Sequence, residues 1–206
     1  MSKQDIADFC DTHDACYLGK NWAVNNCESM HEVWLTARPD WLIWVATSPG
    51  VLPERDLRLF ACWCARKVWH LLTDDRSKNA VIVAEKYARG EATREELACA
   101  EAEAAAAAVA EWGETWTAEW SAAKAAEAAA AAAEWSAARS AEWSAAAAAA
   151  AATEAEWAAA WAAETSEFAA AWAARWAAAA AEKAEREAQA EYLRERFNPF
   201  LKEGKK

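Results

Sequence analysis

The sequence predicts an all-α protein, in which an N-terminal cluster of amphipathic helices is followed by an alanine- and tryptophan-rich multi-helix bundle or helical coil. Among 206 residues there are only five glycines and four prolines, and no stretch shows the apolar/polar alternation of a half-buried strand. About half of residues 91–192 are alanine, the strongest helix former. We therefore expect an amphipathic helical subdomain at 1–90, an alanine- and tryptophan-rich helical subdomain packed on it at 91–198, and a tail at 199–206.

The N-terminal part of the chain carries the start and stop signals of four or five helices. The first is expected from residue 3 to about residue 17, with an apolar side made of Ile6, Phe9, Cys10 and Cys16. A helix with this pattern buries one side against the rest of its subdomain.

Two further helices are expected before residue 48. Ser29 and Glu32 have the spacing of a capping box at the start of one helix. Arg38-Pro39 ends that helix, and Asp40 is expected to cap the next. The apolar residues of this next helix are Trp41, Leu42, Trp44 and Val45.

The strongest helical pattern runs from Pro53 to Leu72. The helix can begin at Pro53, because a proline is tolerated in the first helical turn. Its expected core-facing residues recur at helical spacing: Leu57, Phe60, Ala61, Cys64, Val68 and Leu71. A further helix is expected over residues 77–88, and Gly90 ends it.

The alanine-rich tract begins at the clearest capping box in the chain, Thr93 with Glu96, and contains nine of the fifteen tryptophans. The fragment AEWSAA occurs three times within it, starting at Ala118, Ala133 and Ala141. A single isolated helix would expose large indoles to water and tend to aggregate, so we expect several packed helices. The candidate breaks are residues 113–117, 139–140, 153 and 165–166. Asn198-Pro199 should end the last helix.

Two pieces of the chain resemble a family of bacterial and phage proteins described as immunity proteins. They are DLRLFACWCARKVWHLLTDDRSKNAVIVAEKYARGEATREEL, from Asp56, and QAEYLRERFNPF, from Gln189. The resemblance extends over most of residues 33–200. It implies an all-helical cytosolic protein that binds and neutralises a partner, and it assigns no catalytic or binding residue.

No catalytic or cofactor-binding pattern is present. The sequence lacks a nucleophile elbow, a phosphate-binding glycine loop and a dinucleotide fingerprint, so we expect no enzyme and no cofactor. Cys10, His13, Cys16 and Cys27 are residue types that zinc uses. Their spacing rotates the third ligand away from the first two along a helix, so we expect thiols without a metal.

Charge and apolar runs limit the partners. The formal net charge is −11, and residues 91–206 hold 21 acids against 11 bases, which disfavours direct nucleic-acid binding. No apolar run is long enough to cross a membrane, and the polar start is unlike a signal peptide. Six cysteines then indicate free thiols. The expected location is the cytoplasm.

The main functional hypothesis is a non-enzymatic protein-binding module, an immunity or counter-defence protein that occludes a partner protein. Tryptophan is enriched at interface hot spots. The candidate interface residues are Glu111, Trp112, Trp116, Glu119 and Trp120. The competing interpretation is that the indoles only fill the core of an alanine bundle.

Three alternatives remain open. One is a protein that sequesters a nucleotide-like small molecule in a tryptophan-lined pocket, with Arg58, Arg66 and Lys67 at its mouth to bind phosphate. Another is an acidic DNA mimic, which the wide spacing of acids along the tract disfavours. The third is a structural or oligomerisation module that binds further copies of itself.

Overall fold

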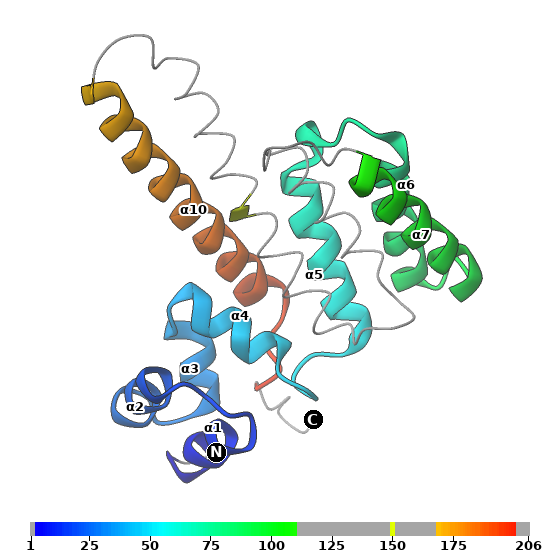
Figure 1. The fold of residues 1–206 in the computed structure, drawn as a ribbon. Coiled ribbons are helices and arrows are strands. Elements are labelled where there is room, and N and C mark those ends of the chain that lie inside the picture. Colours follow the sequence, from blue (N-terminus) through cyan, green and yellow to red (C-terminus); the bar gives the residue numbers. More distant parts are fainter. Residues whose placement is uncertain (1–2, 111–148, 151–167, 201–206) are drawn as a thin grey trace. The chain divides into compact units, whose positions relative to one another are not determined.

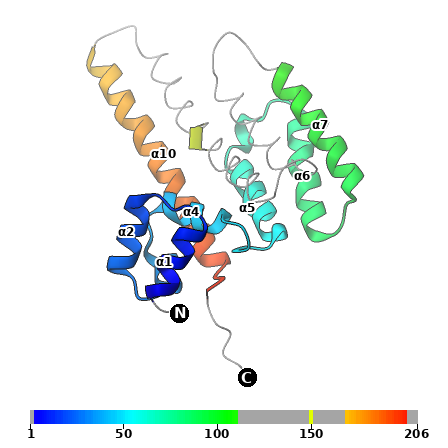
Figure 2. The same cartoon turned by 60° about the horizontal axis from the view of Figure 1, so that its bottom comes forward.

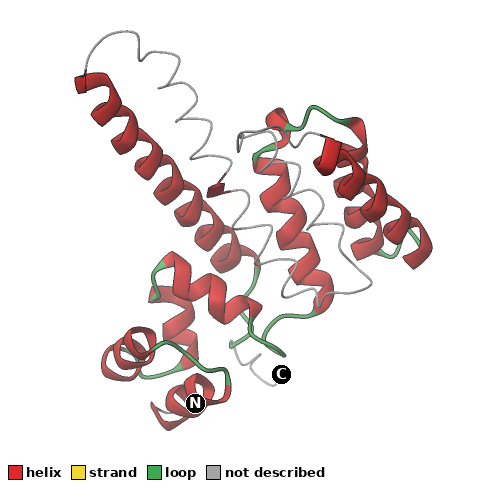
Figure 3. Ribbon diagram, viewed as in Figure 1, coloured by secondary structure: helices red, strands yellow, loops and turns green. Residues whose placement is uncertain are grey.

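The computed structural model describes residues 3–110, 149–150 and 168–200, and all regular elements among them are helical (Figure 1). The predicted all-α class is therefore confirmed, and loops join the described helices (Figure 3). The chain divides into two compact units: unit 1 is Met1–Leu52 with Ala188–Lys206, and unit 2 is Pro53–Glu187. The compositional boundary at residue 90 lies inside unit 2.

Unit 1 contains four short helices and the last turns of a long one. They are α1 (Lys3–Thr12), α2 (Tyr17–Asn26), α3 (Met30–Thr36), α4 (Pro39–Thr47) and the end of α10 (Phe168–Arg196), and Figure 2 shows α1, α2 and α4 from below. Ile6, Trp34, Leu42 and Leu193 are fully buried. The Trp34 indole N–H donates a hydrogen bond to the Phe197 carbonyl at 2.9 Å. The C-terminal segment is thus part of the core of unit 1.

The predicted first helix is wrong in its length. Helix α1 ends at Thr12, and Asp14 then adopts a left-handed conformation with φ 54°. The Ala15 N–H donates to the Cys10 carbonyl at 2.8 Å, which closes the helix end as in a Schellman motif. Cys16 lies outside α1 and is the N-cap of α2.

Helix α2 was not predicted, because its sequence has neither a usual N-cap residue nor a clear apolar side. Its capping atom is the Cys16 Sγ, which accepts from the Gly19 N–H at 3.3 Å, and cysteine is not a preferred N-cap. Tyr17 and Leu18, two large apolar residues of α2, are exposed at 79% and 69% of their surface. The hydrophobic pattern therefore does not mark the buried side of this helix.

The predicted caps of α3 and α4 are partly correct. Ser29 caps α3 as expected, with its Oγ accepting from the Glu32 N–H at 3.2 Å. The Glu32 carboxylate accepts from the N–H of Glu28 rather than that of Ser29, at 2.7 Å. Asp40 is not the cap of α4. The N-cap is Arg38, two residues earlier, and the helix starts at Pro39, since proline fits the first helical position. Asp40 pairs with Arg38.

Unit 2 begins with α5 (Glu54–Lys67), the short 3-10 helix η1 (Trp69–Leu71), α6 (Asp75–Arg89) and α7 (Arg94–Ala110). Helix α6 packs against both α5 and α7 (Figure 1). Where a single helix from Pro53 to Leu72 was expected, α5 ends at Lys67, and Pro53 is its N-cap. Five of the six predicted core-facing residues are buried, and Leu71 is half-buried.

The turn between α6 and α7 confirms two predicted end signals. Gly90 ends α6 with φ 79°, a left-handed conformation that glycine adopts without strain. Thr93 and Glu96 form a reciprocal capping box: the Glu96 carboxylate accepts from the Thr93 N–H at 2.7 Å, and the Thr93 Oγ1 accepts from the Glu96 N–H at 3.2 Å.

Of the alanine-rich tract, the structure describes mainly the start in α7 and the end in α10. Helix α10 ends at Arg196, just before Asn198-Pro199 as predicted. The proposed breaks at residues 113–117, 139–140, 153 and 165–166 lie outside the described residues. Among the residues that are described, no helix has both the length and the apolarity that a membrane crossing requires.

Candidate ligand pocket in unit 1

A cavity of about 300 Å³ lies within unit 1 and is lined by residues of α1, α2, α3, α4 and the turn between α1 and α2. Four aromatic rings line it, those of Phe9, Trp22, Trp41 and Trp44. All four side chains are half-buried, so each is held by the fold and still keeps accessible surface. We call this cavity the aromatic pocket.

The four rings form two pairs of different geometry. The Trp22 and Trp41 rings have centroids 5.3 Å apart and planes tilted by 41°. Phe9 meets Trp44 edge to face, with centroids 6.0 Å apart and planes at 83°. Such pairs contribute about 0.5–1.5 kcal/mol beyond the area they bury. The pairing therefore helps to hold each ring at the cavity wall.

Local sequence explains how these rings reach one cavity. Trp41 and Trp44 are three residues apart on α4, which places them on the same side of the helix. Opposite them, α2 has a glycine at position 19. A Cβ at Gly19 would lie 3.6 Å from the Trp41 ring and 3.2 Å from the Cys16 Sγ. The first distance is ordinary van der Waals contact and the second is tight, so only a very small side chain fits at position 19.

Asp14 is the only charged residue among the described residues that line the aromatic pocket. Its side chain is exposed, and its backbone is in the left-handed region. Aspartate and asparagine tolerate this conformation better than other residues that have a Cβ. The pocket thus combines an apolar wall with a single carboxylate.

Two thiols also line the aromatic pocket, those of Cys10 and Cys16. Burial raises the pKa of the Cys10 thiol, so it is protonated at neutral pH and behaves as a small apolar group. Cys27 instead lies 3.7 Å from the Thr36 hydroxyl. In the described part of the chain, no group of three or more His, Cys, Asp or Glu side chains could hold a metal ion.

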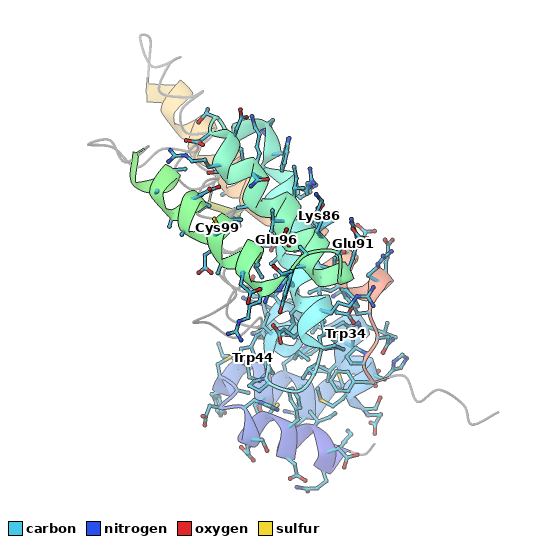
Figure 4. The ribbon with its side chains drawn as sticks, turned by 90° about the vertical axis from the view of Figure 1, so that its right-hand side faces the viewer. Trp34, Trp44, Lys86, Glu91, Glu96 and Cys99 are labelled. Atoms are coloured by element: carbon cyan, nitrogen blue, oxygen red, sulfur yellow. The ribbon has the colours of Figure 1, made fainter. Side chains whose placement is uncertain are left out.

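A second hollow, of about 290 Å³, lies on unit 2 between α6 and α7 (Figure 4). Its charged lining residues are Lys86, Glu91, Glu96 and Glu103. The Glu96 carboxylate is engaged in the capping box, which lowers its pKa through the hydrogen bonds from Thr93. We call this hollow the polar groove.

Of the residues that the sequence singled out, Cys10 and Cys16 line the aromatic pocket. The candidate interface Glu111, Trp112, Trp116, Glu119 and Trp120 lies outside the described residues. Arg58, Arg66 and Lys67 belong to α5 of unit 2. They lie 3.1 Å, 2.9 Å and 4.0 Å from carboxylates of Glu54, Glu85 and Glu185 respectively. The described lining of the tryptophan-lined cavity consists of residues of unit 1 and does not include these three cations.

Sequence reasoning missed the aromatic side chains that line it, although one signal was available. Trp41 and Trp44 share one helical side in a segment that also contains Trp22 and Trp34, a local density of indoles far from the alanine-rich tract. Of these four, only Trp34 is fully buried. No protein-family model, curated protein or solved structure matches the chain.

Proposed function

We propose that this chain is a non-enzymatic binding protein that holds a small, largely apolar molecule in the aromatic pocket. The observation that carries the proposal is a cavity of about 300 Å³ lined by four half-buried rings. Ligand pockets in proteins start at about this volume. An engineered apolar cavity of about 150 Å³ in another protein binds benzene. The volume and the lining both suit a small ring or a cluster of methyl groups.

The energetic argument follows from the exposed ring surface. A ligand that covers these rings removes apolar surface from water, which contributes roughly 25 cal/mol per Å². Phosphate groups are disfavoured, because the only charge in the described lining is the Asp14 carboxylate. Of the small molecules that sequence analysis left open, the geometry favours one without phosphate.

The test measures whether a probe in the pocket protects the Cys16 thiol. Cys16 lines the aromatic pocket and is exposed, whereas exposed Cys99 belongs to unit 2 and serves as the internal reference. Indole at saturating concentration should slow iodoacetamide labelling of Cys16 and leave Cys99 unchanged, as followed by peptide mass spectrometry. Equal labelling of Cys16 with and without indole, together with no heat of binding, would reject the proposal.

Gly19 offers a matched pair of variants for the same experiment. Gly19→Leu places a side chain against the Cys16 Sγ and the Trp41 ring, so it should fill the pocket and abolish protection by indole. Gly19→Ala adds a Cβ in ordinary contact with Trp41 and 3.2 Å from the Cys16 Sγ, so its labelling rate without indole is the baseline, and protection by indole should persist. Protection that persists in the leucine variant would place the probe elsewhere.

A second candidate is capture of a protein partner, as the resemblance to immunity proteins implies. Tyr17 and Leu18 expose 79% and 69% of their surface at the start of α2. They lie between Cys16 and Gly19 in the sequence, two residues that line the aromatic pocket. Adjacent exposed apolar residues of this size are typical of interaction surfaces. The acidic chain, with net charge −11, favours a basic partner.

A double variant with a matched control tests this candidate. Tyr17→Ser with Leu18→Ser should reduce the affinity for a partner captured by the wild-type chain at least tenfold, since hot-spot losses exceed about 2 kcal/mol. Leu35→Ser is the control, because Leu35 is also exposed, at 47%, but lies on α3. Equal affinities for the double variant and the control would contradict a role of α2 in partner binding.

A further inference from the structure

We propose that the ligand of the aromatic pocket is an organic cation that carries a methylated ammonium group. The inference rests on the proposed binding function and adds the chemical class of the ligand. Three features of the described residues support it: the ring pairs, the carboxylate of Asp14, and the scarcity of hydrogen-bond acceptors in the lining.

The ring pairs provide the first feature. The face of an aromatic ring carries negative charge, and a cation within about 6 Å of the ring centre is attracted to it. The rings of Trp22 and Trp41, and those of Phe9 and Trp44, line one cavity of about 300 Å³. A ligand in this volume contacts several rings at once, as in the aromatic cages that bind quaternary ammonium groups.

One of these indoles already has a cation against it. The guanidinium carbon of Arg38 lies 4.7 Å from the centroid of the Trp41 ring. Arg38 also pairs with the Asp40 carboxylate at 2.6 Å, so its positive charge is offset locally. The Trp41 ring is therefore suited to cations, and Arg38 adds little net repulsion at this wall.

Charge at the pocket provides the second feature. Asp14 makes no ion pair with any other described residue, whereas the nearby Lys20 is paired with Asp11. The segment from residue 5 to residue 14 contains four aspartates and no lysine or arginine, so it is acidic. A cationic ligand is attracted by this surface and an anionic ligand is repelled.

The lining also distinguishes between classes of cation. Apart from Asp14, the described side chains of the lining are apolar residues or cysteines. A primary ammonium has three N–H donors, and burial without acceptors leaves them unsatisfied at considerable cost. A trimethylammonium group has no N–H donor and presents methyl groups to the rings. The apolar lining thus fits the methylated ammonium better.

The experiment compares choline with 3,3-dimethylbutan-1-ol, which has the same shape but no charge, by titration calorimetry on the full chain. We expect choline to bind about tenfold more tightly, the effect of contacts with more than one ring. Raising the salt concentration should weaken the binding of choline but not that of the neutral alcohol. Methylammonium, which keeps three N–H donors and has a single methyl group, should bind more weakly than choline.

Asp14→Asn isolates the carboxylate. Asparagine tolerates the left-handed conformation that Asp14 adopts, so the end of α1 should persist, which circular dichroism checks. The affinity for choline should fall about threefold to fivefold, as expected for an exposed charge, and that for the neutral alcohol should not change. Trp41→Leu should reduce the affinity for choline more than that for the alcohol, because leucine keeps the wall apolar but has no ring face.

The outcomes separate the two proposals. If the alcohol binds as tightly as choline and Asp14→Asn has no effect, the cation inference is overturned while the pocket function stands. If neither compound binds while indole still protects Cys16, only the cation inference fails; if indole gives no protection and no heat either, both proposals fail. Nε-trimethyllysine and phosphocholine carry the same cationic group. Tighter binding of one than of choline assigns the source to a modified protein or to a phosphocholine headgroup, and weaker binding of both assigns it to a free small cation.

Discussion

Two hollows of nearly equal volume, about 300 Å³ in unit 1 and about 290 Å³ in unit 2, differ in lining and therefore in what they can bind. The aromatic pocket offers ring surface that water covers poorly. The polar groove offers Glu91, Glu96, Glu103 and Lys86, and water solvates these groups well. A ligand gains free energy by displacing water from the first and gains little from the second. Composition, not volume, distinguishes the two hollows.

The difference arises from how each unit builds its interior. Unit 1 packs short helices around large side chains, and three of its tryptophans are only half-buried. In unit 2, α6 and α7 bury alanines at helical spacing, among them Ala80, Ala84, Ala100, Ala104 and Ala107. Small residues let helices approach closely and leave few internal gaps. Each of the following predictions probes this contrast, and they are ordered from the largest expected effect to the smallest.

Replacing the fully buried indole of unit 1 should have the largest effect. Trp34→Ala removes a side chain with 0% exposure and leaves the Phe197 carbonyl without its donor. The expected loss is about 3–5 kcal/mol in the free energy of unfolding, measured in urea. Trp44→Ala should cost less, since Trp44 is half-buried at the pocket. A larger loss for Trp44 would show that the pocket wall is core.

Adding volume should destabilise unit 2 and spare unit 1. Ala84→Leu inserts three carbons where α6 is fully buried, and should cost about 1–3 kcal/mol. Gly19→Ala adds one carbon beside the aromatic pocket. The better helix propensity of alanine offsets the 3.2 Å approach to the Cys16 Sγ, so stability should rise by no more than about 0.5 kcal/mol. Thermal unfolding of the two variants decides whether the contrast in packing holds.

Thiol reactivity should divide the six cysteines into two classes. Cys16 and Cys99 are exposed, whereas the other four are buried. Burial raises the pKa of the Cys62 thiol to about 12 and that of Cys64 well above its ordinary value, so neither is a thiolate at pH 8. A disulfide reagent such as DTNB should therefore modify two thiols quickly, and the rest only in denaturant. A third fast thiol would reveal a local opening.

The capping box should give the smallest effect, and one that depends on pH. Thr93→Ala removes the N-cap of α7 and should cost about 1 kcal/mol at neutral pH. The hydrogen bonds from Thr93 lower the pKa of Glu96 in the folded state. Its contribution is therefore present above the ordinary glutamate pKa of about 4.3 and is lost as the pH falls through the lowered folded value. Alanine keeps the backbone N–H that donates to the Glu96 carboxylate, so the pH dependence is measured with Glu96→Gln. The stability difference between Glu96→Gln and the wild type should shrink below about pH 4; a constant difference would contradict this linkage.

The sequence predicted the elements whose signals are local. The helix class, the core side of α5, the Thr93–Glu96 capping box and the end of α10 before Asn198-Pro199 all depend on residues within a few positions of each other. The start of α2 was not predicted, because a thiol caps it and because Tyr17 is exposed.

The shape of the aromatic pocket could not be predicted for a different reason, although the density of tryptophans between residues 22 and 44 pointed to this segment. It forms where several helices meet, and no local pattern encodes the space that they leave between them. Gly19 shows this clearly, because its value lies in the approach of α2 to Trp41, a residue on another helix. The tryptophans of the alanine-rich tract drew attention by their number. In contrast, the site that the described residues form uses Trp22, Trp41 and Trp44 from the ordinary-looking start of the chain.

The hydrogen bond between Trp34 and Phe197 also sets an order of events during synthesis. Its two residues are 163 positions apart, and a ribosome adds about 5–20 residues per second. The Trp34 indole therefore waits roughly 10–30 s for its acceptor while the intervening chain emerges. The core of unit 1 is completed only after that delay, although every described lining residue of the aromatic pocket lies between residues 6 and 45. A chaperone that shields exposed indoles would act on unit 1 in this interval.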